Sequence, residues 1–276
     1  MHDAPHPVTA GQALIPPDEN RRMFDTIARR YDLLNSLISL GQDRVWRRAA
    51  VNQLRVQTGG RYADAGCGTG ALCREVAGRL PPSEITLTGI DFSEAMLREG
   101  ARRLQRLGFE IQFQDSGSRG RSPSLPETDR QRSTEGRASV RAVTLVCGDA
   151  LALPFLDNTL DGVISGFVLR NISARPAALA EWFRVLRPGG RCVVLELAVP
   201  ERPLVRWLYR SFTRLLVPTL AFLLSRHRAY IYLLDSIRAF PPSEVICELF
   251  RQAGFDDVRT LPLTFGAVRI YCGSKP

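Results

Sequence analysis

Residues 63–70 read ADAGCGTG and place three glycines at alternate positions directly after a short apolar run. Glycine lacks a Cβ atom, so such a loop can bring its backbone N–H groups close to a ligand at the start of a helix. A dinucleotide-binding loop would read GxGxxG, and a P-loop would end in Lys-Ser or Lys-Thr. The GxGxG spacing disfavours both, so the loop predicts a nucleotide-type ligand of another kind, held after a strand.

Strand-like and helix-like segments alternate along the rest of the chain, which is typical of an α/β sheet with helices on both faces. Two helical patterns are predicted at 93–107 and 174–187, and Pro188 ends the second. Two late strands at 256–262 and 268–274 are close enough to pair as an antiparallel hairpin. Five further apolar runs are predicted as strands, at residues 62–65, 85–90, 143–147, 162–165 and 192–197.

The length of 276 residues and a hydrophobic content of 45% allow one full core. Residues 115–139 are rich in Ser, Arg, Gly and Pro, which predicts a disordered surface insertion, with an RNA-binding or phosphorylated arm as the alternative. Residues 109–114 lead into it and stay unassigned. We divide the chain into a flexible tail, an N-terminal helical lid, a ligand-binding core and a C-terminal part of the same domain, at residues 1–20, 21–58, 59–200 and 201–276.

The net charge of +9 rests almost wholly on arginine, because Lys275 is the only lysine. Such a skew indicates coding bias more than nucleic-acid binding, and no nucleic-acid motif accompanies it. The six cysteines form no CxxC pair and the three histidines are far apart, so we expect a reducing compartment and no metal site. The first residues lack the charged and apolar regions of a signal peptide, which predicts a cytoplasmic protein.

Acidic residues lie at the ends of three of the predicted strands, at Asp64, Asp91 and Asp149. Asp91 is placed to accept both hydroxyls of a ribose, although it could equally cap the helix that follows. Three carboxylates at one sheet edge suit a cationic ligand better than a pyrophosphate. S-adenosylmethionine, a sulfonium without phosphates, fits that polarity.

Four stretches between Met23 and Lys275 resemble the ubiquinone/menaquinone biosynthesis C-methyltransferase family, a group of class I S-adenosylmethionine-dependent methyltransferases. The most specific residues are Tyr31-Asp32, Asn35 and Trp46 together with Leu169-Arg170-Asn171. The stretches themselves are MFDTIARRYDLLNSLISLGQDRVWRR, GDALALPFLDNTLDGVISGFVLRNI, RVLRPGGRCVVLELAVP, and AYIYLLDSIRAFP with LTFGAVRIYCGSK.

The resemblance implies a Rossmann-like, mostly parallel seven-stranded sheet with an antiparallel C-terminal strand. It also implies that Arg170 stabilises a phenolate or orders the water that deprotonates it, although a salt bridge at a strand end is an alternative for Arg170 and a packed core ring for Tyr31. Asn171 and Tyr31 are the other implied catalytic residues. The residues implied to bind the cofactor are Asp64, Gly66, Gly68, Thr69, Asp91, Asp149 and Ala150, and those near the substrate are Asn35, Asp43 and Trp46.

The chain departs from the family pattern at four positions. Asp43 stands where the family usually has histidine, and Val168 where it usually has glycine. Leu34 replaces a methionine and Ala198 a serine. A histidine titrates near 6.5 and an aspartate near 3.9, so a proton-transfer role at position 43 would change character.

The expected reaction is methylation of a ring carbon in a prenylated hydroquinone, with demethylmenaquinol preferred and the ubiquinone-pathway benzoquinol as alternative. A methyltransferase on another small or lipid acceptor, and an inactive membrane-associated binding protein, are the competing hypotheses. Residues 203–225 are apolar but carry Arg206, Arg210 and Arg214 on one helical stripe, which favours peripheral contact with an anionic membrane over a cover helix on the sheet. The oligomeric state stays open, a homodimer included.

Overall fold

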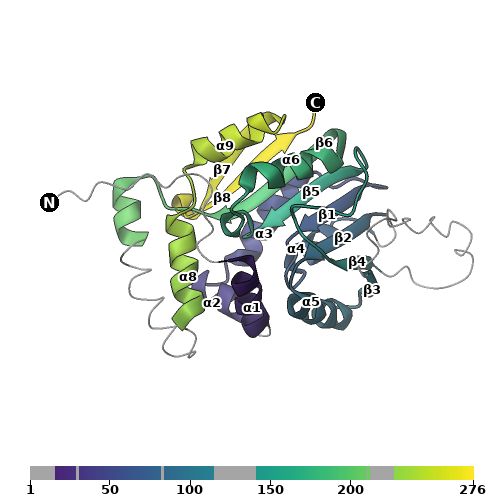
Figure 1. Ribbon diagram of the computed structural model, residues 1–276, viewed down its shortest axis with the longest axis horizontal. Coiled ribbons are helices and arrows are strands. Elements are labelled where there is room, and N and C mark those ends of the chain that lie inside the picture. The colour runs from purple at the N-terminus through teal and green to yellow at the C-terminus, as the bar shows by residue number, and fades with distance from the viewer. Residues whose placement is uncertain (1–15, 29–30, 82–83, 115–140, 210, 212–226) are drawn as a thin grey trace, which may run out of the picture.

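The chain forms one mixed α/β sheet with helices around it in a computed structural model, which describes residues 16–28, 31–81, 84–114, 141–209, 211 and 227–276 (Figure 1). The described residues build eight strands in the order β3-β4-β2-β1-β5-β6-β8-β7. The strands from β3 to β6 run parallel, β8 is antiparallel to β6, and β7 pairs antiparallel with β8. Their bounds are Arg61–Ala65 (β1), Thr86–Asp91 (β2), Glu110–Gln114 (β3), Ala142–Cys147 (β4), Leu160–Gly166 (β5), Leu186–Leu197 (β6), Asp256–Leu263 (β7) and Val268–Ser274 (β8).

The predicted fold class is confirmed, including the antiparallel hairpin at the C-terminus. The expected number of seven strands is wrong, because the unassigned residues before the insertion form an eighth strand, β3, paired with β4 at the sheet edge. Its partly exposed pattern EIQFQ carries a weak strand signal, which is why the sequence left it open. The predicted helix 174–187 ends at Val185, where β6 begins. The insertion 115–139 lies outside the described residues.

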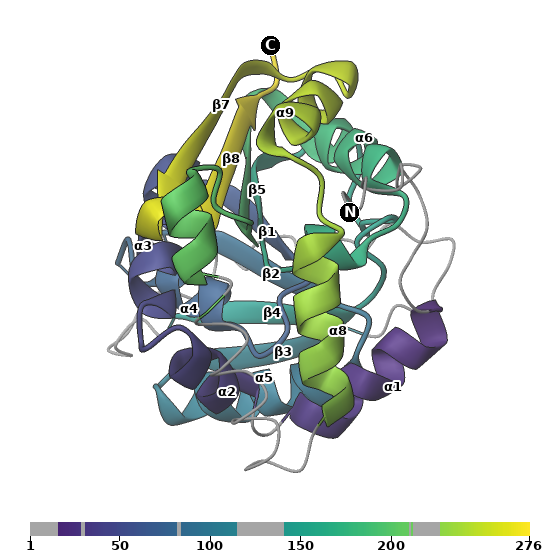
Figure 2. The same ribbon diagram turned by 90° about the vertical axis from the view of Figure 1, so that its left-hand side faces the viewer.

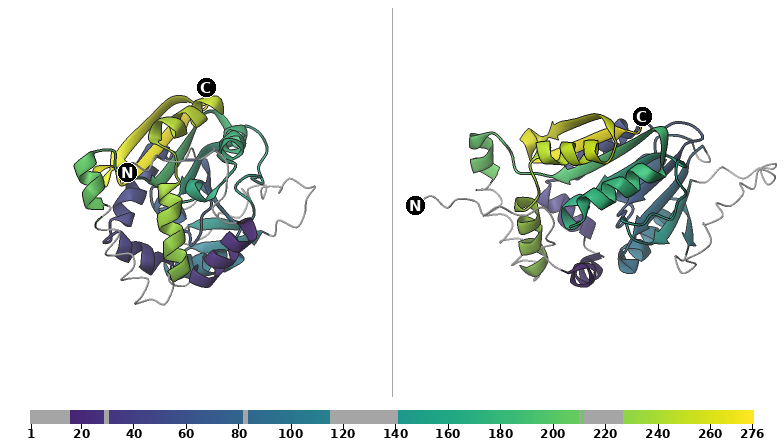
Figure 3. Two further views of the ribbon diagram at one scale, coloured as in Figure 1. Left: turned by 60° about the vertical axis from the view of Figure 1, so that its left-hand side comes forward. Right: turned by 45° about the horizontal axis from the view of Figure 1, so that its top comes forward.

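Helices cover both faces of the sheet (Figures 1 and 3). On one face, Trp46, Leu54, Val76 and Leu104 from α3, α4 and α5 pack into one core cluster; on the other, Trp182 of α6 joins α9 residues in a second. Burial of these large apolar side chains is the main stabilising term for the fold. The helices are α1 (Pro17–Ile27), α2 (Tyr31–Ile38), α3 (Asp43–Leu54), α4 (Ala71–Ala77), α5 (Glu94–Arg106), η2 (Leu169–Asn171), α6 (Arg175–Val185), α8 (His227–Arg238), α9 (Ser243–Gln252) and η3 (Thr264–Gly266).

The N-terminal helices divide between the core and one end of the sheet. α3 buries Ala50, Val51 and Leu54 against the sheet and so contributes to the core. α1, α2 and α8 gather at one end of the sheet, as Figure 2 shows. α1 starts at Pro17, ahead of the predicted boundary at residue 21, with proline at its first turn and two acids after it, a favourable N-terminus.

The chain changes direction across the sheet beside β1. β2 and β4 lie to one side of β1, whereas β5 and β6 lie to the other. Ala65 pairs with Ile90, and Asp91 with Cys147, so the carboxyl ends of β1, β2 and β4 are level. In open α/β sheets ligands bind outside the strand ends at such a reversal, which places the glycine loop where a site is expected.

Candidate active site

A cavity of about 310 Å3 lies at the carboxyl ends of β1, β2, β4 and β5, and we call it the loop cavity. Residues of α1, the first residue of α2 and residues of α3, α4 and α5 also contribute to its wall. The structure brings most of the residues implied by the resemblance together in it: Tyr31, Asp64, Gly66, Gly68, Thr69, Asp91, Asp149, Ala150 and Asn171.

The glycine loop is tied to the end of β2. The backbone N–H groups of Gly66 and Cys67 both donate to the carbonyl oxygen of Ile90, each at 2.8 Å. Gly66 has a φ of +79°, and a Cβ atom there would lie 2.5 Å from Cγ2 of Val168. The Val168 side chain therefore fills the space beside Gly66, so glycine is required at position 66 for both conformation and room. At Gly68 a Cβ atom would meet nothing within 4 Å.

Asp91 connects the glycine loop to the helix that follows β2. One carboxylate oxygen accepts a hydrogen bond from the Gly68 N–H at 2.8 Å, and the other accepts one from the Ser93 N–H at 2.9 Å. The cap of α5 is Ser93, whose hydroxyl accepts from the Met96 N–H, so the predicted alternative of Asp91 as the cap is wrong. Burial raises the pKa of Asp91 to about 6, although the two backbone donors favour its charged form.

Asp64 is the most buried acid of the loop cavity, with no exposed surface. One of its oxygens accepts from Cys73 Sγ at 3.3 Å, and Oδ1 has no partner among the described residues. Burial raises its pKa to about 7, and the nearby Asp91 adds to the rise. Two destabilised carboxylates next to one cavity would both gain from a cationic ligand, so these residues fit a sulfonium cofactor with an amino-acid tail.

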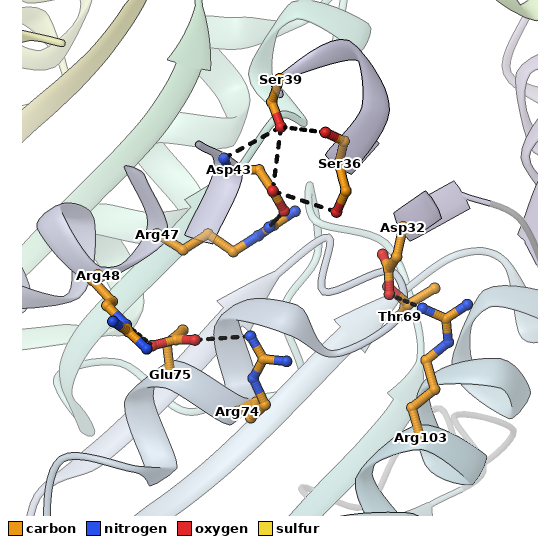
Figure 4. A network of polar contacts seen from close by, with 10 residues as sticks. All are labelled: Asp32, Ser36, Ser39, Asp43, Arg47, Arg48, Thr69, Arg74, Glu75 and Arg103. Carbon is orange, nitrogen blue, oxygen red and sulfur yellow. Dashed lines mark hydrogen bonds and ion pairs between the residues drawn. The ribbon is translucent and has the colours of Figure 1, made fainter. Parts of the chain in front are cut away.

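Thr69 and Asp149 mark opposite parts of the loop cavity. The Thr69 hydroxyl donates to Asp32 at 2.7 Å, and Asp32 is also ion-paired with Arg103, so the loop is held against α2 and α5 (Figure 4). Asp149 is exposed and accepts from the Leu151 N–H at 2.9 Å. It is therefore placed at the rim, where a polar ring edge of a nucleoside could reach it.

A second cavity of about 450 Å3, here called the apolar cavity, shares one lining residue with the loop cavity, Phe167. Most of its wall is aliphatic or aromatic, from α2, α3, the helix at 203–209, α8 and η3. The remaining four residues implied by the resemblance lie here: Asn35, Asp43, Trp46 and Arg170. Trp46 is fixed by a hydrogen bond from its Nε1 to the Thr264 hydroxyl at 2.8 Å and packs edge-on to Phe167.

Arg170 reaches the apolar cavity from a buried ion pair. Its Nη1 donates to Glu196 Oε1 at 2.7 Å and to the Phe167 carbonyl at 2.5 Å, while its backbone N–H donates to Glu196 Oε2 at 3.1 Å. Burial alone would lower the pKa of Arg170, but the Glu196 carboxylate holds it above its usual value. The salt bridge considered from sequence is present, yet Nε has no partner among the described residues.

Asn171 lines the loop cavity, whereas the preceding residue, Arg170, lines the apolar cavity. Its side-chain oxygen accepts from the Tyr232 hydroxyl at 3.1 Å, and its amide donates to the Phe167 carbonyl at 3.3 Å.

Asn35 has a buried amide nitrogen without a partner among the described residues. Tyr31 packs edge-on to Phe24 at 6.0 Å between ring centroids while lining the loop cavity. Tyr31 therefore packs against a neighbouring ring and lines the loop cavity at the same time.

Asp43 is buried in the partition between the two cavities. It accepts from the hydroxyls of Ser39 at 3.2 Å and Ser36 at 3.4 Å and forms an ion pair with Arg47, one helical turn further on (Figure 4). Asp43 lines the apolar cavity, whereas Arg47 lines the loop cavity with its guanidinium 5.8 Å from the centre of the Phe167 ring.

Sequence reasoning missed Glu196 and Arg47. Glu196 is a lone acid inside the apolar run CVVLEL, which is a signal for a buried partner but does not say which one. Arg47 follows Asp43 at the i,i+4 spacing of a helical ion pair, and this signal was available.

The sheet, the glycine loop and the acidic cavity at its end define a class I S-adenosylmethionine-dependent methyltransferase. A solved S-adenosylmethionine-dependent methyltransferase from Thermotoga maritima shares the fold, with a TM-score of 0.56 at 17% identity over 92% of this chain and 99% of that one.

The chain belongs to the ubiE/COQ5 methyltransferase family, whose model matches residues 17–132 and 121–275. It is 38% identical to the ubiquinone/menaquinone biosynthesis C-methyltransferase UbiE of Syntrophotalea carbinolica over 94% of this chain and 95% of the relative. It is 33% identical to the demethylmenaquinone methyltransferase of Anoxybacillus flavithermus over 92% and 94% of the two chains. It is thus an S-adenosylmethionine-dependent C-methyltransferase of the ubiquinone/menaquinone biosynthesis type.

Proposed function

We propose that this chain methylates a ring carbon of demethylmenaquinol. The observation that carries the proposal is the apolar cavity, which is large enough for a quinol ring with the start of its prenyl chain and shares Phe167 with the loop cavity. A relative at 33% identity is named a demethylmenaquinone methyltransferase, which supports this acceptor.

The chain's own residues would position the acceptor and handle its proton. When bound, S-adenosylmethionine supplies an electrophilic methyl group on its sulfonium. A quinol ring carbon becomes a good nucleophile once the adjacent phenol has lost its proton, so the site must stabilise a phenolate. Arg170 lines the apolar cavity, and its guanidinium serves this purpose, directly or through an ordered water. Asn171 and Tyr31, on the loop-cavity side, would align the two reactants.

The acceptor is tested by methyl transfer from labelled S-adenosylmethionine to demethylmenaquinol and to the ubiquinone-pathway benzoquinol, measured side by side. We expect the higher kcat/KM with demethylmenaquinol. A higher value with the benzoquinol would reassign the acceptor. Turnover of neither, with S-adenosylmethionine still bound, would favour another acceptor, and loss of cofactor binding as well would favour an inactive binding protein.

Arg170→Lys tests the role of the guanidinium. Lysine keeps a positive charge beside Glu196 but lacks the planar set of guanidinium donors, so we expect kcat to fall roughly 100- to 1000-fold while the dissociation constant for S-adenosylmethionine stays unchanged. Arg175→Lys is the matched control, because Arg175 donates to backbone carbonyls nearby and lines neither cavity. Normal turnover of Arg170→Lys would show that Arg170 is a structural residue only.

We also propose that a membrane surface delivers the acceptor through residues 203–225. Leu204, Trp207 and Leu208 on the helix at 203–209 are more than half exposed, and Leu208 also lines the apolar cavity. Arg206 donates to the carbonyls of Pro200 and Glu201, while Arg210 and Arg214 lie outside the described residues. Within the described ranges, no helix has the length and apolarity to cross a bilayer.

Flotation with liposomes tests this surface. We expect salt-sensitive binding to vesicles that contain anionic lipid and weaker binding of a Trp207→Ser variant, because interfacial tryptophan anchors such helices. Absence of binding to anionic vesicles would remove the membrane proposal and leave the acceptor assignment intact.

A further inference from the structure

The loop cavity contains carboxylates in excess, yet the cofactor's own amino-acid tail ends in a carboxylate. Asp18, Asp64, Asp91 and Asp149 contribute to its wall. An anionic group among four acids gains from a cation near it. Among the described wall residues two are cationic, Arg21 and Arg47. Arg21 is exposed on α1, whereas the side chain of Arg47 is only 6% exposed.

Arg47 is held in place by its other neighbours. Its Nη1 is ion-paired with Asp43, and Asp43 in turn accepts from the hydroxyls of Ser39 and Ser36 (Figure 4). Asp43 is the single hydrogen-bond partner of the guanidinium within the ranges that the structure describes. A guanidinium has five N–H donors in a fixed plane, so donors remain for a ligand in the cavity that Arg47 lines.

Arg47 also lies near the buried acid of the glycine loop. Burial raises the pKa of Asp64 to about 7, and the charge of Arg47 works against this rise. Asp64 and Arg47 both line the loop cavity and so present a negative and a positive group to it. That arrangement matches the ammonium and carboxylate of an α-amino acid, which carry opposite charges on one carbon atom.

We propose that Arg47 binds the α-carboxylate of the cofactor's amino-acid tail, with Asp43 as the residue that positions the guanidinium. Arg–carboxylate contacts are charge-assisted and can be bidentate, which suits a short zwitterionic tail. Asp43, which stands where the family usually has histidine, would then orient a cofactor-binding arginine from the side of the apolar cavity. The proposal concerns the cofactor alone and stands apart from the choice of acceptor.

The test compares two ligands that differ only in the carboxylate. S-adenosylhomocysteine has the complete tail, whereas S-adenosyl-3-thiopropylamine keeps the amine and lacks the carboxylate. Isothermal titration without acceptor gives the dissociation constant of each. For Arg47→Gln we expect S-adenosylhomocysteine to bind roughly 10- to 100-fold more weakly, since a hydrogen bond to a charged group is lost. The affinity for the amine analogue should change less than about twofold, because that ligand never made the contact.

Two further variants keep this result interpretable. Arg48→Gln is the matched control: Arg48 is the next residue of α3, but its side chain is 66% exposed and paired with Glu75, so neither ligand should be affected (Figure 4). Because Arg47→Gln leaves Asp43 buried without its cation, the double variant with Asp43→Asn removes the unpaired charge. We expect the double variant to show the same ligand-specific loss.

Three outcomes would overturn the proposal. An equal loss for both ligands in the folded double variant would mean that Arg47 only shapes the cavity. Unchanged binding of S-adenosylhomocysteine would place the carboxylate elsewhere. A carboxylate-specific loss in Arg21→Gln, absent from the Arg47 variants, would assign the contact to α1.

Discussion

The loop cavity is formed by turns that follow β1, β2, β4 and β5, whereas the apolar cavity is formed by side chains of α2, α3, α8 and η3 around the other side of Phe167. In the loop cavity, backbone N–H groups and carboxylates make the key contacts, as between Gly68 and Asp91. In the apolar cavity, few polar groups are present and Arg170 is held by Glu196. The first depends on backbone geometry, the second on side-chain volume and one buried ion pair.

This difference predicts how well each of the two cavities tolerates substitution of its residues. A carboxylate that accepts two backbone N–H groups, like Asp91, leaves little freedom in the chain around it. An aliphatic wall tolerates exchange of side chains of similar volume at small cost. The loop cavity should therefore be the more rigid of the two, and the apolar cavity the one whose side chains can be exchanged at smaller cost.

The ion pair behind the apolar cavity should show the largest effect. Glu196→Ala leaves the Arg170 guanidinium buried without its anion, so we expect the free energy of unfolding to fall by about 3–5 kcal/mol. Urea titration measures it. Glu94→Ala, which breaks the exposed pair with Arg98, is the control and should cost less than about 1 kcal/mol. Equal losses in the two variants would show that burial of the Glu196 pair has no special weight.

The glycine loop should show the next largest effect. Gly66→Ala places a methyl group against Val168 at a positive φ, so we expect a loss of roughly 2–4 kcal/mol in the free energy of unfolding, from overpacking together with backbone strain. Gly68→Ala has open space around it and should cost only about 1–2 kcal/mol, from the positive φ alone. Adding Val168→Gly to Gly66→Ala removes the overpacking, so the loss caused by Gly66→Ala should then fall to the value expected for Gly68→Ala. No recovery would contradict the close approach of Val168 to the loop.

A smaller effect is expected from pH, because the loop cavity contains two buried acids, Asp64 and Asp91, that should make cofactor binding depend on pH. The pKa values of Asp64 and Asp91 are raised to about 7 and about 6 in the folded chain without ligand. A raised carboxyl pKa means that protonation stabilises the folded state, and that this contribution is lost as the pH rises from about 4 through the folded pKa. A cationic cofactor needs the ionised carboxylates, so its affinity should increase over the same upper range.

We therefore expect the dissociation constant for S-adenosylmethionine to fall by roughly tenfold or more between pH 5.5 and pH 8, within the limit of tenfold per pH unit for each group. Asp64→Asn should flatten the profile. 5′-Methylthioadenosine, which is uncharged, serves as the control ligand and should show a much weaker dependence. A flat profile for S-adenosylmethionine itself would mean that neither acid faces its charge.

The loop cavity was predictable because its signals are local. Asp64 and Asp91 lie at the ends of β1 and β2, the glycines follow β1, and the carboxyl ends of parallel strands meet at one edge. The apolar cavity joins residues that are far apart in the chain, such as Asn171 with Tyr232 and Trp46 with Thr264. No local pattern marks these pairings.

The fold shows the same contrast on a smaller scale. The strands next to β1 are mostly buried, and their apolar residues allow each to be predicted within one to two residues. β3 is at the sheet edge and half exposed, so its alternation is too weak to separate from a loop. Glu196 was overlooked because a family signature names the residue types at a position without saying that its carboxylate holds Arg170.

The smallest expected effect is at the edge of the apolar cavity. Phe265 lines this cavity while its side chain is 81% exposed, so it contributes little to the core. Phe265→Ser should change the free energy of unfolding by no more than about 0.5 kcal/mol, as surface substitutions do. If the prenyl chain of the acceptor lies against this ring, KM for a long-chain quinol should rise several-fold while KM for an analogue without the chain stays constant. Equal KM changes for both acceptors would place the prenyl chain away from Phe265, and the exit of the apolar cavity would then lie on the side of α8.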